Sequence, residues 1–500
     1  MNAIVCINNN VVRDSRVKRQ VNALADEYEH VHVVAVAEPD ENFGVQRNNV
    51  TYSFAKIEHY DYPATPYLRE QLKKWKLYDE IVEYCPILES DTYNQYFEMR
   101  YLAFLYKILT SSERYQEIQN RKAEKMDLQP ALSYIIRFIE NSIGIAKEAE
   151  KYEADVIICN DEDSLLAGVV HKRNKGTKLI YDIHDLMCDI TQNVFPLVYS
   201  EMLVLYEKNM VQYADCVMGA GKYLLEWIDE HYCLKVPCVP IFNCGTGDKI
   251  LLQEKKYDEE NIRIYYQGLA YPNRNLEILI RAIQDIDEVS VVIRSDDNEY
   301  VKTLKKLVDE LELTRRVSFV DLVSTEKVYE AANKDGDIGI YLADPSESIN
   351  WRASFTNKFL EYLTAGLPVI TTNARDQAEI VLKYDCGYVL ENLSIEELHN
   401  LLIEIKKDRK ELTEKSKNAM YVGQQLFNWN IYKEQMINLI KEKPINNSKA
   451  ETTEKCIWTN EEKEIQRKIN KIQSYPKIMK YLYAIKEEKY ETVRDNRKLK

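Results

Sequence analysis

Short apolar runs alternate with amphipathic stretches in the first half of the chain. Residues 3–7 (AIVCI) and 31–36 (VHVVAV) have the pattern of buried strands, and a helix that begins at Asp14 or Ser15 lies between them. A strand, a helix and a strand within about 36 residues predict a βαβ unit, so a parallel sheet begins here. The alternation returns later, with strands expected at residues 155–159, 178–181 and 214–218.

A second alternating pattern begins at residue 262. Its strands are expected at residues 262–266, 289–293, 317–320, 338–342 and 369–371, and its helices at residues 276–283, 300–311, 326–333, 379–382, 396–405 and 421–440. Two such patterns in 500 residues predict an α/β protein of two domains. We place one Rossmann-like domain at residues 1–245 and another at 246–424, with a hinge at 243–249, a returning helix at 425–443 and a linker with a basic helical tail at 444–500.

Two regions depart from this pattern. Residues 60–150 are expected to form an inserted helical subdomain, with helices at 67–84, 92–109 and 132–151. Its basic stretch at 69–76 could lie on anionic lipid or hold an acceptor, although a solvated helix face is the simpler interpretation. The tail at 465–500 is equally compatible with a partner helix, a lipid contact or a solvated end.

The clearest single stretch is residues 351–372 (WRASFTNKFLEYLTAGLPVITT). Ser354 or Thr356 can cap a helix there, and Lys358 and Glu361 lie in its first turns. The unbonded N–H groups and partial positive charge of a helix start suit a phosphate, and Lys358 adds a full charge. A carboxylate at Glu361 can accept hydrogen bonds from sugar hydroxyls. This stretch therefore predicts a nucleotide-sugar site.

Other candidate residues stand where strands end. His184 follows the strand at 178–181 and lies between Asp182 and Asp185, which favour its charged form. A structural role, with the ring bonded to a loop carbonyl, is the alternative. Arg274 precedes the helix at 276–283, where its fork matches phosphate oxygens. The loop after the first strand, residues 8–10 (NNN), lacks the Gly-x-Gly-x-x-Gly fingerprint of dinucleotide binding.

Composition narrows the choice of partners. The net charge of −14 disfavours nucleic acid and anionic lipid as general partners. The ten cysteines are scattered without zinc-binding spacing, so no metal site is expected. The chain shows no signal peptide and no apolar run long enough to span a membrane. We therefore expect a cytoplasmic protein, with peripheral contact at the inner face of the membrane as a further option.

Four segments together resemble the GT-B glycosyltransferases, in particular the retaining family-4 group. They are residues 13–16 (RDSR) with the following helix and strand, residues 181–185 (YDIHD), Gly268 with Arg274-Asn275, and residues 356–368 (TNKFLEYLTAGLP). The last segment resembles a Pro-Asn-Lys…Glu-Tyr…Ala-Gly-x-Pro signature and is the most specific. The resemblance implies two Rossmann-like domains that face each other across a cleft, with the nucleotide sugar held mainly by the second.

The resemblance also implies roles for individual residues. Arg274 and Lys358 would contact the diphosphate, Glu361 would bind the ribose, and His184 would lie beside the transferred sugar. Further donor-binding candidates are Gly268, Asn275, Ser354, Thr356 and Asn357. The candidates for the acceptor or the cleft are Asn9, Asn10, Arg16, Asp182 and Asp185.

This chain differs from the family pattern at several positions. The first carboxylate of the usual Glu-x7-Glu pair is replaced by Ala353, and the proline of Pro-Asn-Lys by Thr356. Leu269 stands where a basic residue is common, and Arg294-Ser295 stands where a strand usually ends in glycine. These changes bear on which sugar is used and on whether the site is active.

The expected function is a retaining transfer of a sugar from a nucleotide-diphosphate sugar, with UDP as the favoured nucleotide and without metal or cofactor. The acceptor would be a hydroxyl of a bacterial surface glycan, a lipid-linked saccharide or a protein. The alternative is a catalytically degenerate GT-B subunit that binds a glycan or a partner glycosyltransferase. A sugar-nucleotide epimerase of the same fold is a third option.

Overall fold

The computed structural model describes residues 1–9, 11, 14–36, 45–57, 70, 73–77, 128–190, 203, 206–245, 252, 257, 260–353 and 355–441. The chain divides into two compact units, and each is described by itself. The first consists of Met1–Met218, Glu226–Val239 and the chain from Leu439, and the second of Gly219–Leu225 and Pro240–Asn438.

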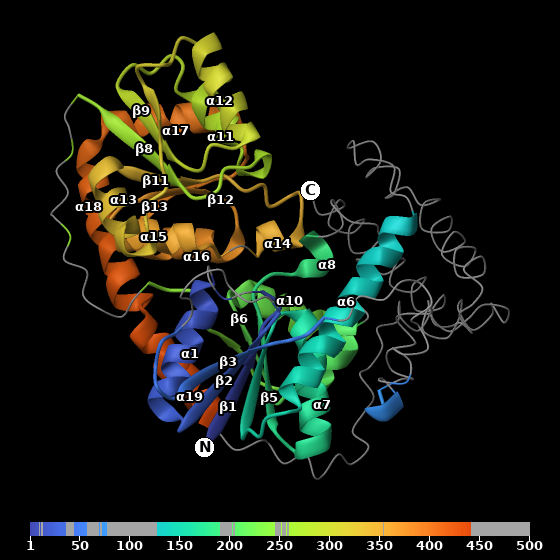
Figure 1. The fold of residues 1–500 in the computed structure, drawn as a ribbon. Helices are drawn as coiled ribbons and strands as arrows, with labels where there is room; N and C mark the ends of the chain where they lie inside the picture. The colour runs from blue at the N-terminus through green and yellow to red at the C-terminus, as the bar shows by residue number, and fades with distance from the viewer. Residues whose placement is uncertain are drawn as a thin grey trace, which may run out of the picture. The chain divides into compact units, whose positions relative to one another are not determined.

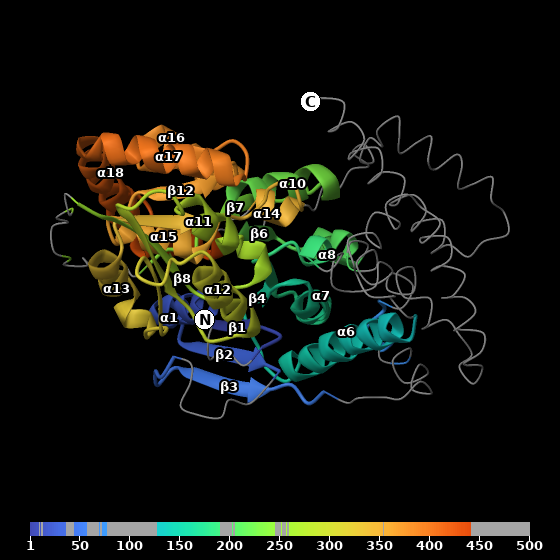
Figure 2. The same cartoon turned by 90° about the horizontal axis from the view of Figure 1, so that it is seen from above.

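The first unit is built on a seven-stranded sheet in the order β3-β2-β1-β4-β5-β6-β7 (Figure 2). Its strands are β1 (Asn2–Cys6), β2 (His30–Ala35), β3 (Val50–Phe54), β4 (Val156–Asn160), β5 (Lys178–Ile183), β6 (Cys216–Gly219) and β7 (Cys238–Pro240). The pairs β1–β2, β2–β3, β1–β4 and β4–β5 are parallel. From β1 the chain adds strands first on one side (β2, β3) and then on the other (β4 to β7), so the strand order reverses between β1 and β4. Open α/β sheets bind ligands at such a switch point.

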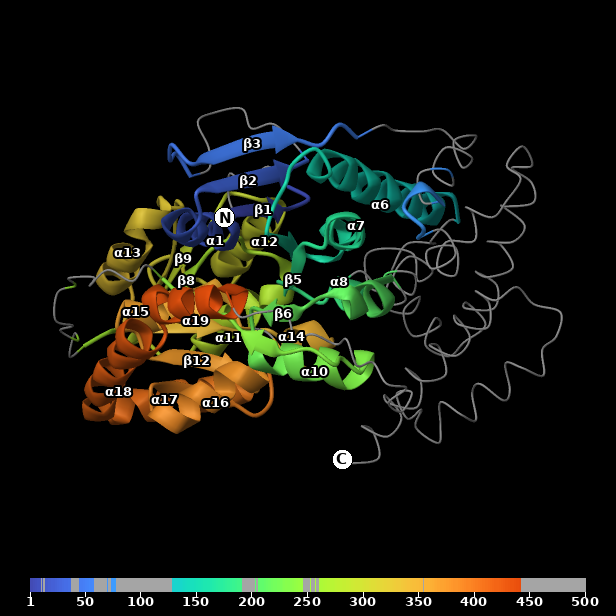
Figure 3. The same cartoon turned by 90° about the horizontal axis from the view of Figure 1, so that it is seen from below.

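Helices cover both faces of this sheet, with α1 on one side and α6 and α7 on the other (Figures 1 and 3). The helices of this part are α1 (Ser15–Glu27), α6 (Leu128–Ala149), α7 (Leu165–Lys175), α8 (Met187–Ile190) and α10 (Lys222–Tyr232), of which residues 222–225 belong to the second unit. Asp14 caps α1, because its carboxylate accepts from Val17 N at 3.0 Å. The predicted capping residue and the predicted βαβ unit are both confirmed.

The second unit has a six-stranded sheet in the order β10-β9-β8-β11-β12-β13. Its strands are β8 (Ile262–Gln267), β9 (Val289–Arg294), β10 (Val317–Val320), β11 (Ile338–Tyr341), β12 (Val369–Thr372) and β13 (Gly387–Leu390). All five neighbouring pairs are parallel. The strand order matches that of β1 to β6, so each unit has the Rossmann arrangement and its own switch point. In the second sheet that point lies between β8 and β11.

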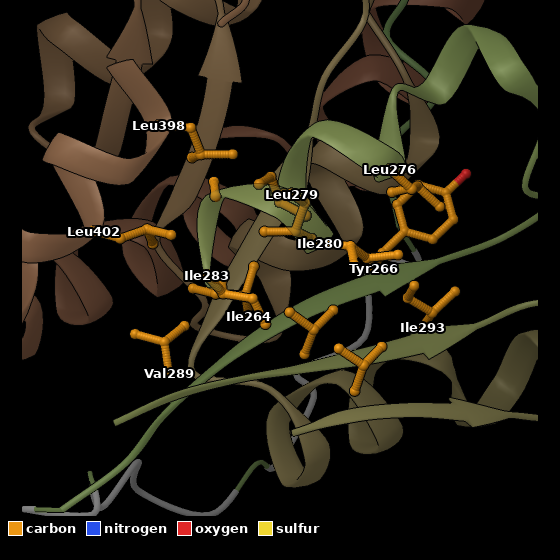
Figure 4. Packing of buried hydrophobic residues seen from close by; sticks show 14 of the residues in the cluster. Ile264, Tyr266, Leu276, Leu279, Ile280, Ile283, Val289, Ile293, Leu398 and Leu402 are labelled. Carbon is orange, nitrogen blue, oxygen red and sulfur yellow. The ribbon is translucent and has the colours of Figure 1, made fainter. Parts of the chain in front are cut away.

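Two helical layers enclose the second sheet. Its helices are α11 (Leu276–Ala282), α12 (Glu299–Glu310), α13 (Val328–Asp335), α14 (Ile349–Arg352), α15 (Asn357–Thr364), α16 (Arg375–Tyr384), α17 (Ile395–Lys407), α18 (Arg409–Tyr421) and α19 (Trp429–Lys441), and α19 continues into the first unit after Asn438. Ile264 and Tyr266 pack on one face with residues of α11, such as Leu279, and with Leu398 and Leu402 of α17 (Figure 4). On the opposite face Tyr265 packs in a second cluster with α13, α15 and α16.

The helix expected at residues 421–440 is interrupted in the structure. The chain there passes from α18 through a five-residue π-helical turn, Val422–Leu426, to α19. The wider turn accompanies a close approach of Gly423 to α15, where a Cβ would lie 2.3 Å from Thr364 N. Gln424 Nε2 also donates to the Thr364 carbonyl at 3.0 Å. Tertiary packing on α15 therefore outweighs the helical pattern of the sequence.

Several sequence expectations fall outside the described residues. These include the helix at 92–109, most of the helix at 67–84, residues 246–249 of the hinge and the tail at 444–500. The helix expected at 132–151 is confirmed as α6. Within the part of the chain that the structure describes, no helix combines the length and the apolar character needed to cross a bilayer.

Candidate functional site

The start of α15 is fixed by Thr356, whose hydroxyl accepts from Phe359 N at 3.3 Å. Of the two predicted capping residues, Thr356 is confirmed, and Ser354 lies outside the described residues. Phe359 and Tyr362 are fully buried, so the apolar face anchors this helix against the sheet. The half-buried Lys358 therefore projects from a helix start that is held rigidly.

Lys358 lies directly over Gly268, the residue that follows β8. A Cβ on Gly268 would lie 2.4 Å from Lys358 Cε and 3.0 Å from Nζ, and the φ of Gly268 is +108°. Burial, together with the nearby Arg274 charge, lowers the pKa of Lys358 to about 8, although Glu361 acts in the opposite direction. The ammonium is therefore held at the carboxyl edge of the sheet. An anionic ligand bound there would stabilise the charged form of Lys358.

Arg274 ends a short 3₁₀ turn, Pro272–Arg274, in the same loop after β8. Its guanidinium lies 5.0 Å from the ring centroid of Trp351 and 5.8 Å from that of Tyr341, and Nη1 is 3.4 Å from Tyr341 Oη. Its Nε is buried without a hydrogen-bond partner. Two aromatic rings thus orient a guanidinium that keeps a donor for a ligand.

Asn275 connects this loop to the neighbouring strand. Its Nδ2 donates to the Leu342 carbonyl at 2.7 Å, and its backbone is left-handed with φ 53°. Leu342 directly follows β11, so the bond crosses the switch point between β8 and β11. The side chain of Asn275, a predicted donor-binding residue, therefore shapes the loop that carries Arg274.

Glu361 lies one turn after Lys358 and is half-buried. Gln267, the last residue of β8, donates from Nε2 to Glu361 Oε2 at 2.5 Å. Asn357, at the start of the same helix, is exposed and accepts a hydrogen bond from Asn243. The structure thus brings Gly268, Arg274, Lys358 and Glu361 together at one edge of the second sheet.

The first unit gathers a separate set of polar groups around His184, just after β5. Asn160 Oδ1 is 3.0 Å from His184 Nε2, Asp161 Oδ1 accepts from His184 N at 3.0 Å, and Asp161 Oδ2 is 3.4 Å from Nδ1. Burial opposes the positive charge of the ring, but Asp161 and then Asp182 outweigh it and raise the pKa of His184 to about 9. The ring is therefore a cation at neutral pH, as the sequence predicted.

Arg16 and Asp182 form a buried pair and do not line an accessible surface. Arg16 Nε and Nη2 donate to the two oxygens of Asp182 at 2.8 and 2.5 Å, and Gln20 donates to the same carboxylate. Asp182 is 0% exposed and Arg16 4%. Both residues, which the sequence predicted for the acceptor or the cleft, are buried here, and Arg16 holds the Asp182 carboxylate charged.

The loop after β1 is also internally bonded. Asn9 Oδ1 accepts from Val11 N at 2.6 Å, and its Nδ2 donates to Asp14 Oδ2 at 3.0 Å, so this predicted acceptor residue shapes the loop. Asn10 lies outside the described residues, and Asp185 is exposed. The neighbouring Asn8 donates to Asp163, which follows β4.

Sequence reasoning did not single out Asp161 as a site residue. Its backbone has φ 60° and ψ 168°, a region that side chains other than glycine rarely occupy and that is often strained at functional sites. The signal available in the sequence was its position directly after the buried strand β4. Gln267, Tyr341 and Trp351 were likewise missed in the second unit. Gln267 and Tyr341 end the strands β8 and β11, and Trp351 lies in the short helix α14. Among the described residues, no group of three or more His, Cys, Asp or Glu side chains is arranged to hold a metal ion.

With these two sheets and their helices, the chain has the GT-B fold class of glycosyltransferases. Residues 248–421, which span β8 to α18, match a family described as Glycosyl transferases group 1. A search of curated proteins gave no significant match.

Solved structures share this fold at low sequence identity. Sucrose-phosphate synthase from Thermosynechococcus elongatus has a TM-score of 0.60 at 14% identity, covering 88% of this chain and 98% of that one. Anabaena HepE, in complex with UDP, has a TM-score of 0.56 at 14% identity, with 88% and 99% covered. WaaG, a glycosyltransferase involved in lipopolysaccharide biosynthesis, has a TM-score of 0.54 at 12% identity, with 88% and 100% covered.

Proposed function

We propose that this protein is a glycosyltransferase that uses a nucleotide-diphosphate sugar, with UDP as the nucleotide. The observation that carries the proposal is the placement of Lys358 over Gly268, beside Arg274, at the switch point of the second sheet. Two cations and a helix start converge there, and a carboxylate on the same helix can accept from ribose hydroxyls. The match of residues 248–421 to Glycosyl transferases group 1 and the UDP complex of HepE support this choice.

The positive groups of this site complement the negative charge that develops on the leaving diphosphate. When the bond between the sugar and the diphosphate breaks, negative charge develops on the leaving phosphate oxygen. Arg274, Lys358 and the dipole of α15 would stabilise that charge without a metal ion. We propose a retaining course, in which the acceptor hydroxyl attacks from the face that the diphosphate leaves. The departing phosphate oxygen takes the hydroxyl proton, so no protein base is needed.

The acceptor that we propose is a hydroxyl of a bacterial surface glycan, a lipid-linked saccharide or a protein, reached from the cytoplasm. His184 would lie beside the transferred sugar as a cation, and Asp161 and Asp182 would keep its ring protonated. The two ring N–H groups face Asn160, Asp161 and Asp182, so the ring would act on the transferred sugar through its positive charge.

A donor screen tests the proposal. Purified protein is incubated with UDP-, GDP- and ADP-sugars, with and without candidate acceptors and with EDTA, and nucleotide release and the anomeric configuration of the product are measured. We expect acceptor-dependent release from a UDP-sugar, with retention and without inhibition by EDTA. Arg274→Ala should remove most of this rate, while Arg281→Ala, an exposed arginine on α11, should not. Full activity of the Arg274→Ala variant would refute the role of that residue.

Ala353 favours a second candidate function, a catalytically degenerate subunit that binds a glycan or a partner glycosyltransferase. This residue stands in place of the usual carboxylate and is 4% exposed, so no acidic group takes that position. Calorimetry separates the two functions. Binding of UDP-sugar with turnover supports the enzyme, whereas absence of nucleotide binding supports the degenerate subunit.

A further inference from the structure

A chain of side-chain hydrogen bonds runs through the interior of the second unit and ends at Glu361. Arg294 Nε donates to Tyr265 Oη at 2.9 Å, and Tyr265 Oη donates to Gln267 Oε1 at 3.0 Å. Gln267 Nε2 then donates to Glu361 Oε2 at 2.5 Å. Arg294 and Gln267 are register partners at the ends of the adjacent strands β9 and β8. All three residues before Glu361 are buried, with exposures of 8%, 0% and 3%.

The direction of this chain follows from the chemistry of its first member. An arginine can only donate, so Tyr265 Oη must accept from Arg294, and its own single proton points to Gln267. That proton requires the carbonyl oxygen of the Gln267 amide on the Tyr265 side, which turns the NH₂ group toward Glu361. Burial raises the pKa of Tyr265 to about 12, so the phenol keeps its proton at neutral pH.

Further hydrogen bonds fix this series of side chains at Arg294 and at Gln267. Arg294 Nη2 donates to Asp335 Oδ2 at 2.7 Å, and Nη1 donates to the Asp321 carbonyl. The backbone N–H of Gln267 donates to Tyr362 Oη at 2.9 Å, which fixes the strand end against α15. The side-chain amide of Gln267 is therefore held between Tyr265 Oη and Glu361 Oε2 from a fixed strand end.

We propose that Arg294, Tyr265 and Gln267 are positioning residues that aim the Glu361 carboxylate at the ribose hydroxyls of the nucleotide. This inference rests on the proposed function, because it takes Glu361 as the ribose-binding group. The amide occupies Oε2 and fixes the plane of the carboxylate, so the ribose diol meets an acceptor that needs no reorientation. Arg294 thus acts on the nucleotide through two intervening side chains, although it touches no ligand.

The test compares UDP with 2′,3′-dideoxy-UDP by calorimetry, because their affinity ratio isolates the ribose hydroxyls from the diphosphate. In the unaltered protein we expect UDP to bind at least about tenfold more tightly, the magnitude of a hydrogen bond to a charged group. Glu361→Ala should bring the ratio close to one. Tyr265→Phe removes one hydroxyl and keeps the ring, so the Gln267 carbonyl loses its donor and the amide that contacts Glu361 is no longer held in one orientation. The ratio should then fall to about threefold or less, with the affinity for 2′,3′-dideoxy-UDP changed by less than about twofold.

Controls separate positioning from general loosening. Tyr257→Phe removes another partly buried phenol hydroxyl in the same unit, which contacts the Leu412 carbonyl, and should leave the ratio unchanged. Arg294→Met should lower the ratio as Tyr265→Phe does. A merely structural role would weaken both nucleotides equally, and that result would overturn the inference.

The outcomes also distinguish this inference from the function on which it rests. If the unaltered protein does not bind UDP, the proposed function fails and the inference fails with it. If UDP binds and Glu361→Ala abolishes the preference for ribose, while Tyr265→Phe keeps it, only the positioning role is overturned.

Discussion

The ammonium-bearing end of Lys358 occupies the space that a side chain at position 268 would fill. Lys358 Cε lies 2.4 Å from the ideal Cβ position of Gly268, closer than real Cβ atoms approach other atoms. Because the φ of Gly268 is also +108°, the glycine is required both for the backbone turn after β8 and for the seat of the lysine. The cation therefore depends on the absence of a side chain 90 residues earlier in the sequence.

Gly268→Ala should displace Lys358 and weaken UDP binding by about tenfold or more, while costing about 1–2 kcal/mol of folding stability from the positive φ. Calorimetry and urea unfolding measure the two effects. Gly176→Ala is the matched control, since φ there is +73° but no atom lies within 4 Å of the added Cβ. It should show the stability cost alone, and equal nucleotide affinity in both variants would contradict the prediction.

UDP affinity should depend on pH through Lys358. Its pKa of about 8 lies below the ordinary lysine value, so the ammonium is present below pH 8 and is lost as the pH rises above it. Bound diphosphate favours the charged form, and affinity should fall by up to about tenfold per pH unit above 8. Lys358→Arg keeps its charge throughout and should give a flat profile between about pH 7 and 9. A flat profile in the unaltered protein would show that the lysine is not the titrating contact.

His184 should titrate near pH 9 by NMR, because Asp161 and Asp182 outweigh the burial of its ring. Asp161→Asn removes the larger of these two stabilising charges, and the pKa of His184 should then fall below about 8. His32 is an internal control, since burial and His30 lower its pKa to about 4 and its ring contacts Thr51 and Ser53. The pKa of His32 should not move. A His184 pKa near 6.5 in the unaltered protein would contradict the geometry.

Arg16→Met should destabilise the first unit by about 3–5 kcal/mol, because it leaves the buried carboxylate of Asp182 without its bidentate partner. The loss appears as a lower urea-unfolding midpoint of the first unit. Arg47→Met breaks a half-exposed pair with Asp26 in the same unit and serves as the control, with a change of at most about 1 kcal/mol expected. Similar midpoints for the two variants would show that the Arg16 pair adds little.

The alternation of strands and helices was predictable because buried parallel strands appear as uninterrupted apolar runs. The strand expected at 155–159 lies within one residue of β4, whose five residues are all buried. β3 was not predicted, since four of its five residues are only partly buried and its run lacks that pattern. β13 was missed because it is four residues long and begins with glycine.

The position of candidate residues was predictable where they stand next to a helix start or a strand end, as for Lys358, Arg274 and Glu361. The partners of Arg16 and Gln267 could not be predicted, because they are set by tertiary contacts. Arg16 meets Asp182 across 166 positions of sequence, and Gln267 is aligned with Arg294 only through strand register. A single sequence carries no local signal for either pairing.

The π-helical turn at Val422–Leu426 makes the position of α15 sensitive to substitutions far from the candidate site. Gly423 fits against Thr364 N and Leu363 C so closely that any bulkier residue must push the C-terminal end of α15. Since α15 has only eight residues, such a push would also move its opposite end, where Lys358 is located. A substitution at position 423 could then disturb the candidate site without changing any residue in it. Mutagenesis confined to the carboxyl edge of the second sheet would not find such a variant.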